Sequence, residues 1–521
     1  MEQQDMQKRF MIFFGAVALL LISFSLISQY FFKDNTQNQK NQTQQTQREA
    51  AAPIKQISGS YDLVLTGERV NVDNLKDIVR IKTKEGYIEF SNIGGRIVSA
   101  FDNRYNIDIV PEFSKSNKVF PGEIITTDIN ITKLLNFSKY ESKIQDNKIS
   151  FYLKNENVEV EKTYTINDDN TITVDIKTKG LESVGLAYLT GITLKSEGTF
   201  GHNGPIIKTD KEIIKINNDI NTIQTIRDKI LWAGQENKYF MQILSIKGGI
   251  NTVYIVPVAK DTTVVLSEIP ASFEGFNYLG PKLYSLLGEI TDKYQKLWNV
   301  DLGLRSSIDF GFFGILGKPL FLLLHFIYDF VHNWGLAIIV LTVLLRLVLF
   351  PLNHKSLKAM KKMADLAPEM EKLKKKYAKD PQKLQEEIMK LYAEAGANPM
   401  SGCLPILAQI PIFIALYNVL MVTVELKNAP FMLWIKDLSD KDPYYVLPIL
   451  MGLSMVAQQF ITPSSDKNQR MIMYIMAGVF TFMFMNFPSG LVLYWLTNNI
   501  LGLIQSVIVN KSMKKWTKIQ S

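Results

Sequence analysis

Hydrophobic residues are distributed unevenly along the chain. An uncharged run at 10–32 and several long apolar runs within 318–510 flank a stretch, 57–310, in which apolar and polar residues alternate. The first run has 23 residues, enough for a helix to cross a hydrocarbon core of about 30 Å. It is longer than the apolar core of a signal peptide and no A-x-A-like cleavage site follows it. Residues 1–32 are therefore predicted to be an uncleaved transmembrane signal anchor.

The region after this run reads as a linker followed by a β-domain. Residues 33–56 begin with a Gln- and Asn-rich stretch that has no apolar face, which predicts a flexible linker. Region 57–315 contains short alternating segments such as KISFYLKN, TITVDIKT, NTVYIVPV and TTVVLSE, separated by Asn, Asp and Gly turns. Alternation with a period of two is typical of half-buried strands. We therefore expect a large all-β sandwich outside the membrane.

Five further apolar segments are predicted to cross the membrane, so that the fold is an integral membrane bundle of six transmembrane helices plus the β-domain. The second span is expected at 335–352 and the last four lie within 404–510. The sequence Phe487-Pro488-Ser489-Gly490 predicts a tight turn between the fifth and sixth spans.

The segment 316–334, just before the second span, is predicted to be an amphipathic helix in the outer membrane interface. His325, Asp329 and His332 fall on one face of this helix. The alternative is that the segment forms part of a longer crossing. The two histidines are two helical turns apart, too far to bind one ion, so no metal site is predicted.

The distribution of lysines predicts the orientation. Region 353–394 has eleven lysines and seven acidic residues, so it is expected in the cytoplasm together with the basic tail, 511–521. The loop at 425–442 has three lysines and four acidic residues, which suits the outside. Both termini are then expected in the cytoplasm and the β-domain on the outer side of the membrane.

The lysine-rich region 353–403 is predicted to form a cytoplasmic helical hairpin. Apolar residues recur every three or four positions in both halves. Pro368 is expected to kink or split the first helix, and Asp380-Pro381 to start the second. The lysines form either a solvated face or a docking site for ribosomal RNA or anionic lipid headgroups. Charge alone does not separate these alternatives.

Composition limits the remaining chemistry. The single cysteine, Cys403, excludes an internal disulfide framework. No G-x-x-x-x-G-K-[ST] phosphate loop occurs in the chain, so nucleotide hydrolysis by this chain is not supported. The net charge of +8 is concentrated beside the apolar runs. We expect no catalytic residues, no cofactor and no metal.

One arginine lies inside a predicted span, in LTVLLRLVLFPL. Arg346 is six residues from the cytoplasmic end of its helix, and an arginine at the centre of a span costs about 2.5–3.5 kcal/mol. Other intramembrane polar residues share this cytoplasmic half or lie near mid-depth: Thr342, Gln409, Gln458, Gln459, Asn498, Asn499 and Gln505. This asymmetry predicts a hydrated pocket that is open to the cytoplasm and sealed outside. The alternative is that Arg346 extends to the lipid headgroups.

Four segments go beyond these patterns: NWGLAIIVLTVLLRLVLFPL, NPMSGCLPILAQIPIFIALYNVL, APFMLWIKDLSDKDPYYVLPILMG and FPSGLVLYWLTNNILGLIQ. Together they closely resemble the YidC membrane protein insertases (the YidC/Oxa/Alb family). The large outer domain resembles the Gram-negative type, whose β-domain is similar to sugar-mutarotase sandwiches. The resemblance implies a five-helix insertase core that inserts and folds inner-membrane proteins, alone or with the Sec translocon, without nucleotide hydrolysis.

The resemblance also implies a substrate groove. Its arginine matches Arg346, and a groove threonine one turn earlier matches Thr342. In the third span, the positions that contact substrates match Gln409, Ile410, Pro411 and Phe413. An aromatic position of the last span matches Trp495, beside Tyr494. Asn418 departs from the family's pattern and is interpreted as locally structural.

The implied partners are nascent membrane proteins, the Sec translocon, membrane lipids and the ribosome. Ribosome contact is expected through the hairpin, the loop 462–470 and the short basic tail. One alternative function is a small-solute transporter or channel with Arg346 as an anion site, although no paired repeat with broken helices is visible. Another is a carbohydrate-active outer domain, whose only histidine, His202 in FGHNGP, is interpreted as a turn residue.

Overall fold

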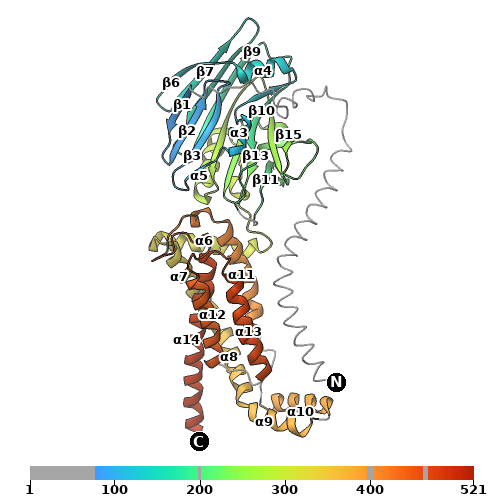
Figure 1. Cartoon of the computed structure of the whole chain (residues 1–521), viewed down its shortest axis with the longest axis vertical. Helices are drawn as coiled ribbons and strands as arrows, with labels where there is room; N and C mark the ends of the chain where they lie inside the picture. Colours follow the sequence, from blue (N-terminus) through green and yellow to red (C-terminus); the bar gives the residue numbers. More distant parts are fainter. Residues whose placement is uncertain (1–76, 198–200, 379, 396–403, 462–466, 521) are drawn as a thin grey trace.

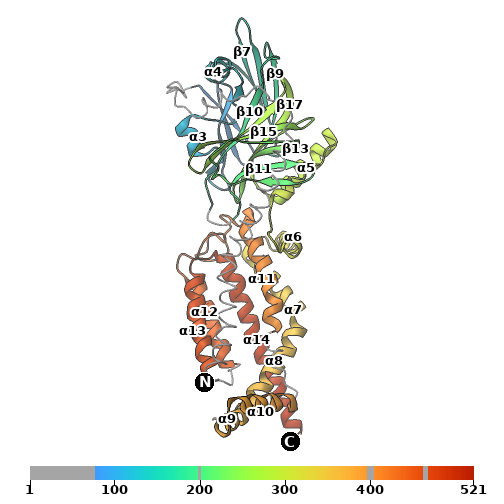
Figure 2. The same cartoon turned by 90° about the vertical axis from the view of Figure 1, so that its right-hand side faces the viewer.

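The computed structural model describes residues 77–197, 201–378, 380–395, 404–461 and 467–520. These residues form an elongated molecule with a β-domain at one end and a bundle of helices below it (Figure 1). Helices α9 (Ala367–Lys376) and α10 (Pro381–Glu394) project sideways at the end of the bundle that lies far from the β-domain (Figure 2). The predicted signal anchor and linker, residues 1–56, lie outside the described residues.

The β-domain consists of antiparallel strands. Their bounds are β1 (Ile78–Lys82), β2 (Gly86–Ser91), β3 (Arg96–Asp102), β4 (Ile107–Asp108), β5 (Ile124–Thr126), β6 (Glu141–Gln145), β7 (Lys148–Lys154), β8 (Glu159–Ile166), β9 (Thr171–Lys179), β10 (Leu186–Ile192), β11 (Gly204–Thr209), β12 (Ile213–Lys215), β13 (Gln224–Glu236), β14 (Phe240–Ile246), β15 (Ile250–Ala259), β16 (Thr262–Ile269) and β17 (Ser272–Pro281). Short helices α3 (Glu112–Asn117) and α4 (Ile129–Phe137) lie within the domain, and α5 (Tyr284–Trp298) follows its last strand.

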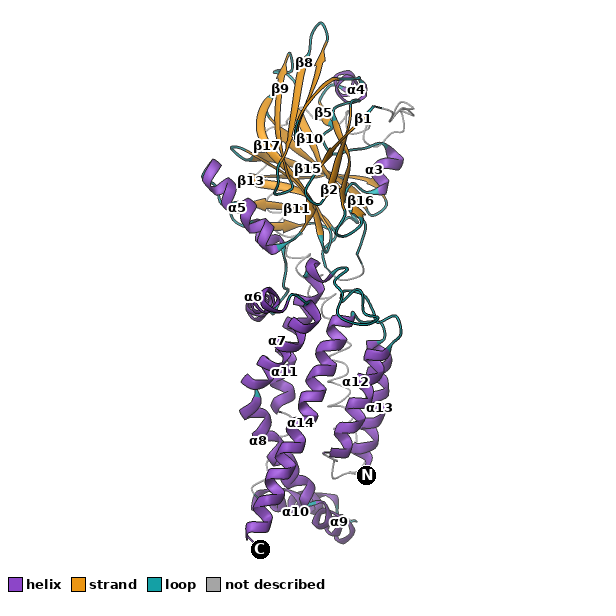
Figure 3. Cartoon of the chain, turned by 90° about the vertical axis from the view of Figure 1, so that its left-hand side faces the viewer, coloured by secondary structure: helices purple, strands orange, loops and turns teal. Residues whose placement is uncertain are grey.

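Two sheets enclose the core of this domain, as Figure 3 shows. Strands β1 to β4 form one sheet in sequential order, and the other strands form a larger sheet in which β10, β16, β15, β13, β14, β17, β9, β8, β7 and β6 follow one another. The alternating segments found in the sequence are strands: KISFYLK is β7 and TITVDIKTK is β9. The predicted β-sandwich is therefore confirmed.

A lysine is enclosed in the core of the β-domain. The Lys162 ammonium donates hydrogen bonds to the carbonyl oxygens of Gly94 and Gly122, at 2.7 and 2.9 Å. Nearby, Arg96 and Glu123 form a buried salt bridge of 2.6 Å. Burial, and the positive charge of Arg96, lower the pKa of Lys162 to about 7. The protonation state of Lys162 is therefore coupled to the stability of this domain.

The helices after α5 build the lower part of the molecule. Their bounds are η3 (Leu304–Ser307), α6 (Gly314–Val331), α7 (Trp334–Val348), α8 (Phe350–Asp365), α9 (Ala367–Lys376), α10 (Pro381–Glu394), α11 (Leu404–Val422), η5 (Val424–Leu426), α12 (Val446–Ile461), α13 (Lys467–Phe484) and α14 (Ser489–Gln520). Within the described residues, the helices Gly314–Val331 and Ser489–Lys511 are long and apolar enough to span a membrane. Three shorter apolar helices are Ala408–Val422, Val446–Ile461 and Arg470–Phe484. The count of six spans remains a prediction.

Helix α6 occupies the segment predicted to lie in the interface. It lies crosswise to α11 and α14, between the bundle and the β-domain (Figures 1 and 2). One side is buried through Leu320, Phe321 and Leu324, whereas Phe326 and Phe330 are exposed. Its length and composition also suit a membrane span, but this crosswise placement favours the interface.

The second predicted span, 335–352, contains a break between two helices. Helix α7 stops at Val348, and α8 leaves it with a bend of 65°. Pro351 lies in the first turn of α8. Because proline has no backbone N–H, it starts a new helix more readily than it continues the old one.

The predicted hairpin has three helices. Its first half is split into α8 and α9 just before Pro368, and Asp380 caps α10 by accepting a hydrogen bond from the Lys383 backbone N–H at 3.1 Å. The split and the cap agree with the sequence pattern. The predicted basic tail differs in that α14 continues through it without a break, as far as Gln520.

The β-domain and the helical part are joined at a polar junction. Glu425, in the loop between α11 and α12, pairs with His325 of α6, with 3.2 Å between Glu425 Oε1 and His325 Nε2. Asn428 of the same loop donates to the Arg104 carbonyl of the β-domain at 3.5 Å. The Lys427 ammonium lies over the Tyr239 ring, 5.3 Å from its centre. We call the contacts of Lys427 and Asn428 with the β-domain, including the Lys427–Glu197 salt bridge, the domain junction.

Candidate functional site

Arg346 faces the interior of the helical bundle. Helix α7 begins at an N-cap, Asn333, whose side chain accepts from the Leu336 backbone N–H at 3.0 Å, and it carries Arg346 in its last turn. The guanidinium Nη1 donates to Oδ1 of Asn498 on α14 at 3.2 Å. It also lies against the backbone of α14, since a Cβ atom at Gly502 would be 2.7 Å from Nη2. The arginine therefore contacts α14 rather than only lipid.

The surroundings of Arg346 are polar but, within the described part of the chain, contain no counter-ion. Among the described residues, no carboxylate lies within salt-bridge distance of the guanidinium. Its Nε atom is buried and has no hydrogen-bond partner within the described part of the chain. A buried polar atom of this kind is normally hydrated.

A polar seam joins α12 and α14 beside the arginine. Asn499 donates to the Ser454 hydroxyl at 3.0 Å, and Gln458 donates to the Ser506 hydroxyl at 2.9 Å. The Gln458 Oε1 atom is 4.0 Å from the Cβ position at Gly502, so the seam reaches the contact between Arg346 and α14. Polar groups buried between membrane helices usually pair in this way.

Further unpaired polar atoms lie where α7, α8 and α14 meet. Gln505 donates to the Phe350 carbonyl at 3.3 Å, but its own Oε1 is buried without a partner in the described chain. The same holds for Asn353 Nδ2 and His354 Nδ1 at the start of α8. Buried polar atoms without a protein partner are normally paired with water or with a ligand.

The other predicted site residues occupy two environments. Thr342 is buried, and its hydroxyl donates to the Ile338 carbonyl of its own helix at 2.6 Å. Gln409 lies next to the Tyr494 side chain, which in turn lies near Arg346. Gln409 and Tyr494 thus lie close to the arginine, whereas the Thr342 hydroxyl is already satisfied.

The aromatic residues form a cluster across three helices. The ring of Phe413 on α11 contacts Trp495 edge-on with 4.8 Å between centres, and its centre is 6.4 Å from that of Tyr494. Trp495 also contacts Phe484 of α13, at 5.3 Å. Ile410 and Pro411 lie three and two residues before Phe413 and are partly exposed. These apolar side chains provide a surface next to the polar seam.

The sequence reasoning placed Asn498 near mid-depth but did not choose it as a site residue, and it did not consider Gly502. Asn498, Gly502 and Ser506 recur every four residues, which places them on one face of α14. That stripe was the available signal. Asn418, in contrast, donates to the Phe310 carbonyl at 3.0 Å, as suits a structural residue.

The β-domain contains a histidine–carboxylate pair that the sequence did not predict. His202 Nδ1 lies 3.0 Å from Glu236 Oε1, so it is more than a turn residue. Glu236 is fully buried, and Lys215 and Lys282 lie 3.3 and 3.1 Å from its oxygens. Burial raises the pKa of Glu236, but the lysines outweigh this effect and hold its pKa well below the ordinary value. A carboxylate so enclosed and neutralised is not available as a base for a sugar.

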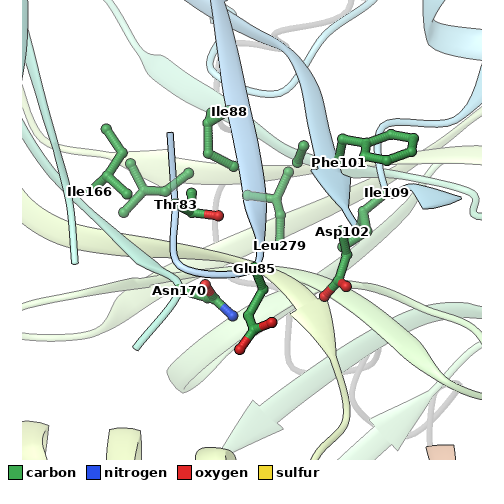
Figure 4. A pocket seen from close by; sticks show the side chains of 11 residues that line it. Thr83, Glu85, Ile88, Phe101, Asp102, Ile109, Ile166, Asn170 and Leu279 are labelled. Atoms are coloured by element: carbon green, nitrogen blue, oxygen red, sulfur yellow. The ribbon is translucent and has the colours of Figure 1, made fainter. Parts of the chain in front are cut away.

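A pocket lies between the two sheets of the β-domain (Figure 4). Glu85 and Asp102 lie at one rim, with Ile88 and Leu279 among the apolar side chains behind them. Both carboxylates are already paired with Arg104, at 3.6 and 2.9 Å. The pocket therefore offers no free pair of carboxylates for acid–base chemistry.

The architecture defines a class: a helical membrane protein with a large β-domain and a polar site inside its helices. Two family descriptions match the chain, "YidC periplasmic domain" over residues 79–323 and "60Kd inner membrane protein" over residues 326–516. A membrane protein insertase YidC from Aquifex aeolicus is 37% identical over 514 residues, covering 98% of this chain and 96% of the relative. One from Campylobacter jejuni is 32% identical over 532 residues, covering 98% and 97%.

The chain therefore belongs to the YidC membrane protein insertase family, a family of bacterial inner-membrane proteins. Among solved structures, an active YidC insertase with its first transmembrane domain resolved matches with a TM-score of 0.42 and 22% identity, covering 82% of this chain and 92% of that one.

Proposed function

We propose that this chain inserts and folds inner-membrane proteins through a hydrophilic groove in the cytoplasmic half of its helical bundle. The observation that carries the proposal is the Arg346 guanidinium, which contacts a neutral amide at 3.2 Å and has a buried, unpartnered Nε within the described chain. A cation without a counter-ion costs free energy inside a bilayer unless water or a ligand solvates it. A visiting carboxylate provides that compensation.

The electrostatic step follows from this arrangement. A client segment enters the groove from the cytoplasm, and Arg346 attracts the acidic residues of its short translocated tail. A charge-assisted contact lowers the cost of removing those carboxylates from water. Gln409, Tyr494, Asn499 and Gln505 supply further polar groups in the groove, and Thr342 shapes its wall.

The apolar part of the client requires a different surface. Its hydrophobic segment packs against Ile410, Pro411, Phe413 and Trp495 before it moves into lipid. Burial of apolar surface in lipid, together with the membrane potential acting on charged tails, supplies the driving force. The mechanism therefore needs no nucleotide hydrolysis and no cofactor.

The proposed topology has six spans, both termini in the cytoplasm and the β-domain in the periplasm. The excess of lysine in α8 to α10 supports this orientation. The chain works alone or beside the Sec translocon. Its hairpin, the loop 462–470 and the basic tail contact the ribosome or anionic lipid headgroups.

The alternative function is a small-solute transporter or channel in which Arg346 binds an anion. Purified chain in proteoliposomes distinguishes the two functions. Our proposal predicts insertion of an added single-span client, measured by protease protection, without flux of small anions above that of empty vesicles. Anion flux without client insertion would contradict the proposal and favour the transporter.

A further inference from the structure

We infer that Asn498 is a positioning residue for Arg346: it holds the guanidinium against α14 through a neutral acceptor, so that the positive charge stays available for client carboxylates. This inference rests on the proposed function. Asn498 contacts the arginine, and the role that we assign to it requires no contact with the client.

The first observation is the geometry of the contact. Asn498 Oδ1 accepts one hydrogen bond from Arg346 Nη1 at 3.2 Å, and this is the single hydrogen bond that the guanidinium makes to a side chain in the described residues. Arginine has five N–H donors in a planar fork. One bond to an amide therefore fixes the position of the group and leaves most of its donors for another acceptor.

The second observation is the space made for the guanidinium. Gly502 lies one turn after Asn498 on α14, and a Cβ atom there would be 2.7 Å from Arg346 Nη2. Any side chain at position 502 would push the guanidinium away. Asn498 and Gly502 thus form one binding position for the guanidinium: Asn498 accepts a hydrogen bond from it, and the missing side chain at Gly502 leaves the room that Nη2 occupies.

The chemistry of the acceptor is the third point. An aspartate has almost the same shape as an asparagine, but it would form an ion pair with Arg346 inside the bundle. An internal ion pair would satisfy the arginine and compete with client carboxylates. The amide positions the arginine without this competition.

The test uses full-length chain in proteoliposomes and two single-span clients that differ only in their translocated tail, which carries Asp and Glu or their amides. The measured quantity is the ratio of insertion of the acidic-tail client to that of the neutral-tail client. Asn498→Asp is expected to lower this ratio about tenfold, as Arg346→Ala does, because the client then loses its charge-assisted hydrogen bond with Arg346. Insertion of the neutral-tail client is expected to stay within about twofold of wild type.

Two further variants separate positioning from a structural role. Asn498→Ala is expected to lower the ratio, but to have no further effect on it in an Arg346→Ala background. Gly502→Ala keeps the acceptor but displaces the guanidinium, so it is expected to lower the ratio too. Asn510→Ala is the matched control, because this amide of α14 donates to the Ile461 carbonyl at 3.0 Å instead; it should leave the ratio unchanged.

The inference is overturned if folded Asn498→Asp protein keeps the wild-type ratio while Arg346→Ala loses it. It is also overturned if Asn498→Ala lowers the ratio further in the absence of Arg346. If Arg346→Ala itself keeps the wild-type ratio, the electrostatic step of the proposed function fails, and this inference fails with it. Gel filtration in detergent checks that each variant is folded. If Asn498→Asp is not folded, the Gly502→Ala variant supplies the decisive result.

Discussion

Lys427 of the loop between α11 and α12 forms a salt bridge with Glu197 of the β-domain, with 2.6 Å between Nζ and Oε2. The two side chains are 18% and 17% exposed, so the pair is largely shielded from water. Because Lys427 belongs to the helical part and Glu197 to the β-domain, this contact ties together two parts that are far apart in the sequence.

Reversing one charge of this pair should loosen the domain junction. Lys427→Glu places two carboxylates together, and we expect the free energy of unfolding to fall by about 1–3 kcal/mol, as for a partly buried pair. Glu197→Lys in the same chain should restore more than half of the loss. Thermal unfolding in detergent measures both effects, with Lys436→Glu, an exposed position in the same loop, as the control. Equal losses for Lys427→Glu and Lys436→Glu would contradict the junction.

The buried lysine of the β-domain should make its stability depend on pH. The pKa of Lys162 is lowered to about 7 from an ordinary value of 10.5. Between these values the unfolded chain binds more protons than the folded chain, so stability rises as the pH rises from 7. We expect the free energy of unfolding to increase by about 2–3 kcal/mol between pH 7 and pH 9 relative to Lys162→Met. The same pH dependence in both proteins would contradict the assignment.

A glycine in the segment that leads into α6 should tolerate no side chain. Gly311 has φ +68°, and a Cβ atom there would be 2.7 Å from Nδ2 of Asn418. Gly311→Ala therefore adds backbone strain and a clash, and we expect a loss of about 1–3 kcal/mol. Gly478 of α13 has no atom within 4 Å of its Cβ position, so Gly478→Ala should change stability by less than about 1 kcal/mol. Comparison of the two unfolding temperatures checks this, and a similar loss in both would be inconsistent with it.

Much of the fold could be predicted because it depends on periodicity. The period-two segments are strands, the turn before Ser489 separates α13 from α14, and Pro368 and Asp380 mark helix ends. The bend between α7 and α8 was not predicted, because hydrophobicity continues to Leu352 while helix α7 ends at Val348. A hydrophobic pattern shows which segments are apolar, but it does not show where a helix ends. A proline near the break determines where the helix stops.

The site was predictable in part for a similar reason. An arginine in an apolar run can be recognised from the sequence alone, and the depth of the polar residues around it can be estimated in the same way. The hydrogen-bond partner of Arg346 cannot be recognised from the sequence, because Asn498 lies 152 positions away and the two helices meet only in the folded bundle. The pairing of His202 with Glu236 escaped prediction likewise, since tertiary contacts join a loop to the end of β13.

The central claim is that Arg346 receives the acidic tails of client proteins. The most direct measurement is insertion of the acidic-tail and neutral-tail clients in cells depleted of the wild-type chain and supplied with Arg346→Ala or Arg346→Lys. We predict that Arg346→Ala lowers insertion of the acidic-tail client about tenfold, that Arg346→Lys restores much of it, and that the neutral-tail client inserts normally in both. Equal insertion of the two clients by every variant would contradict the account.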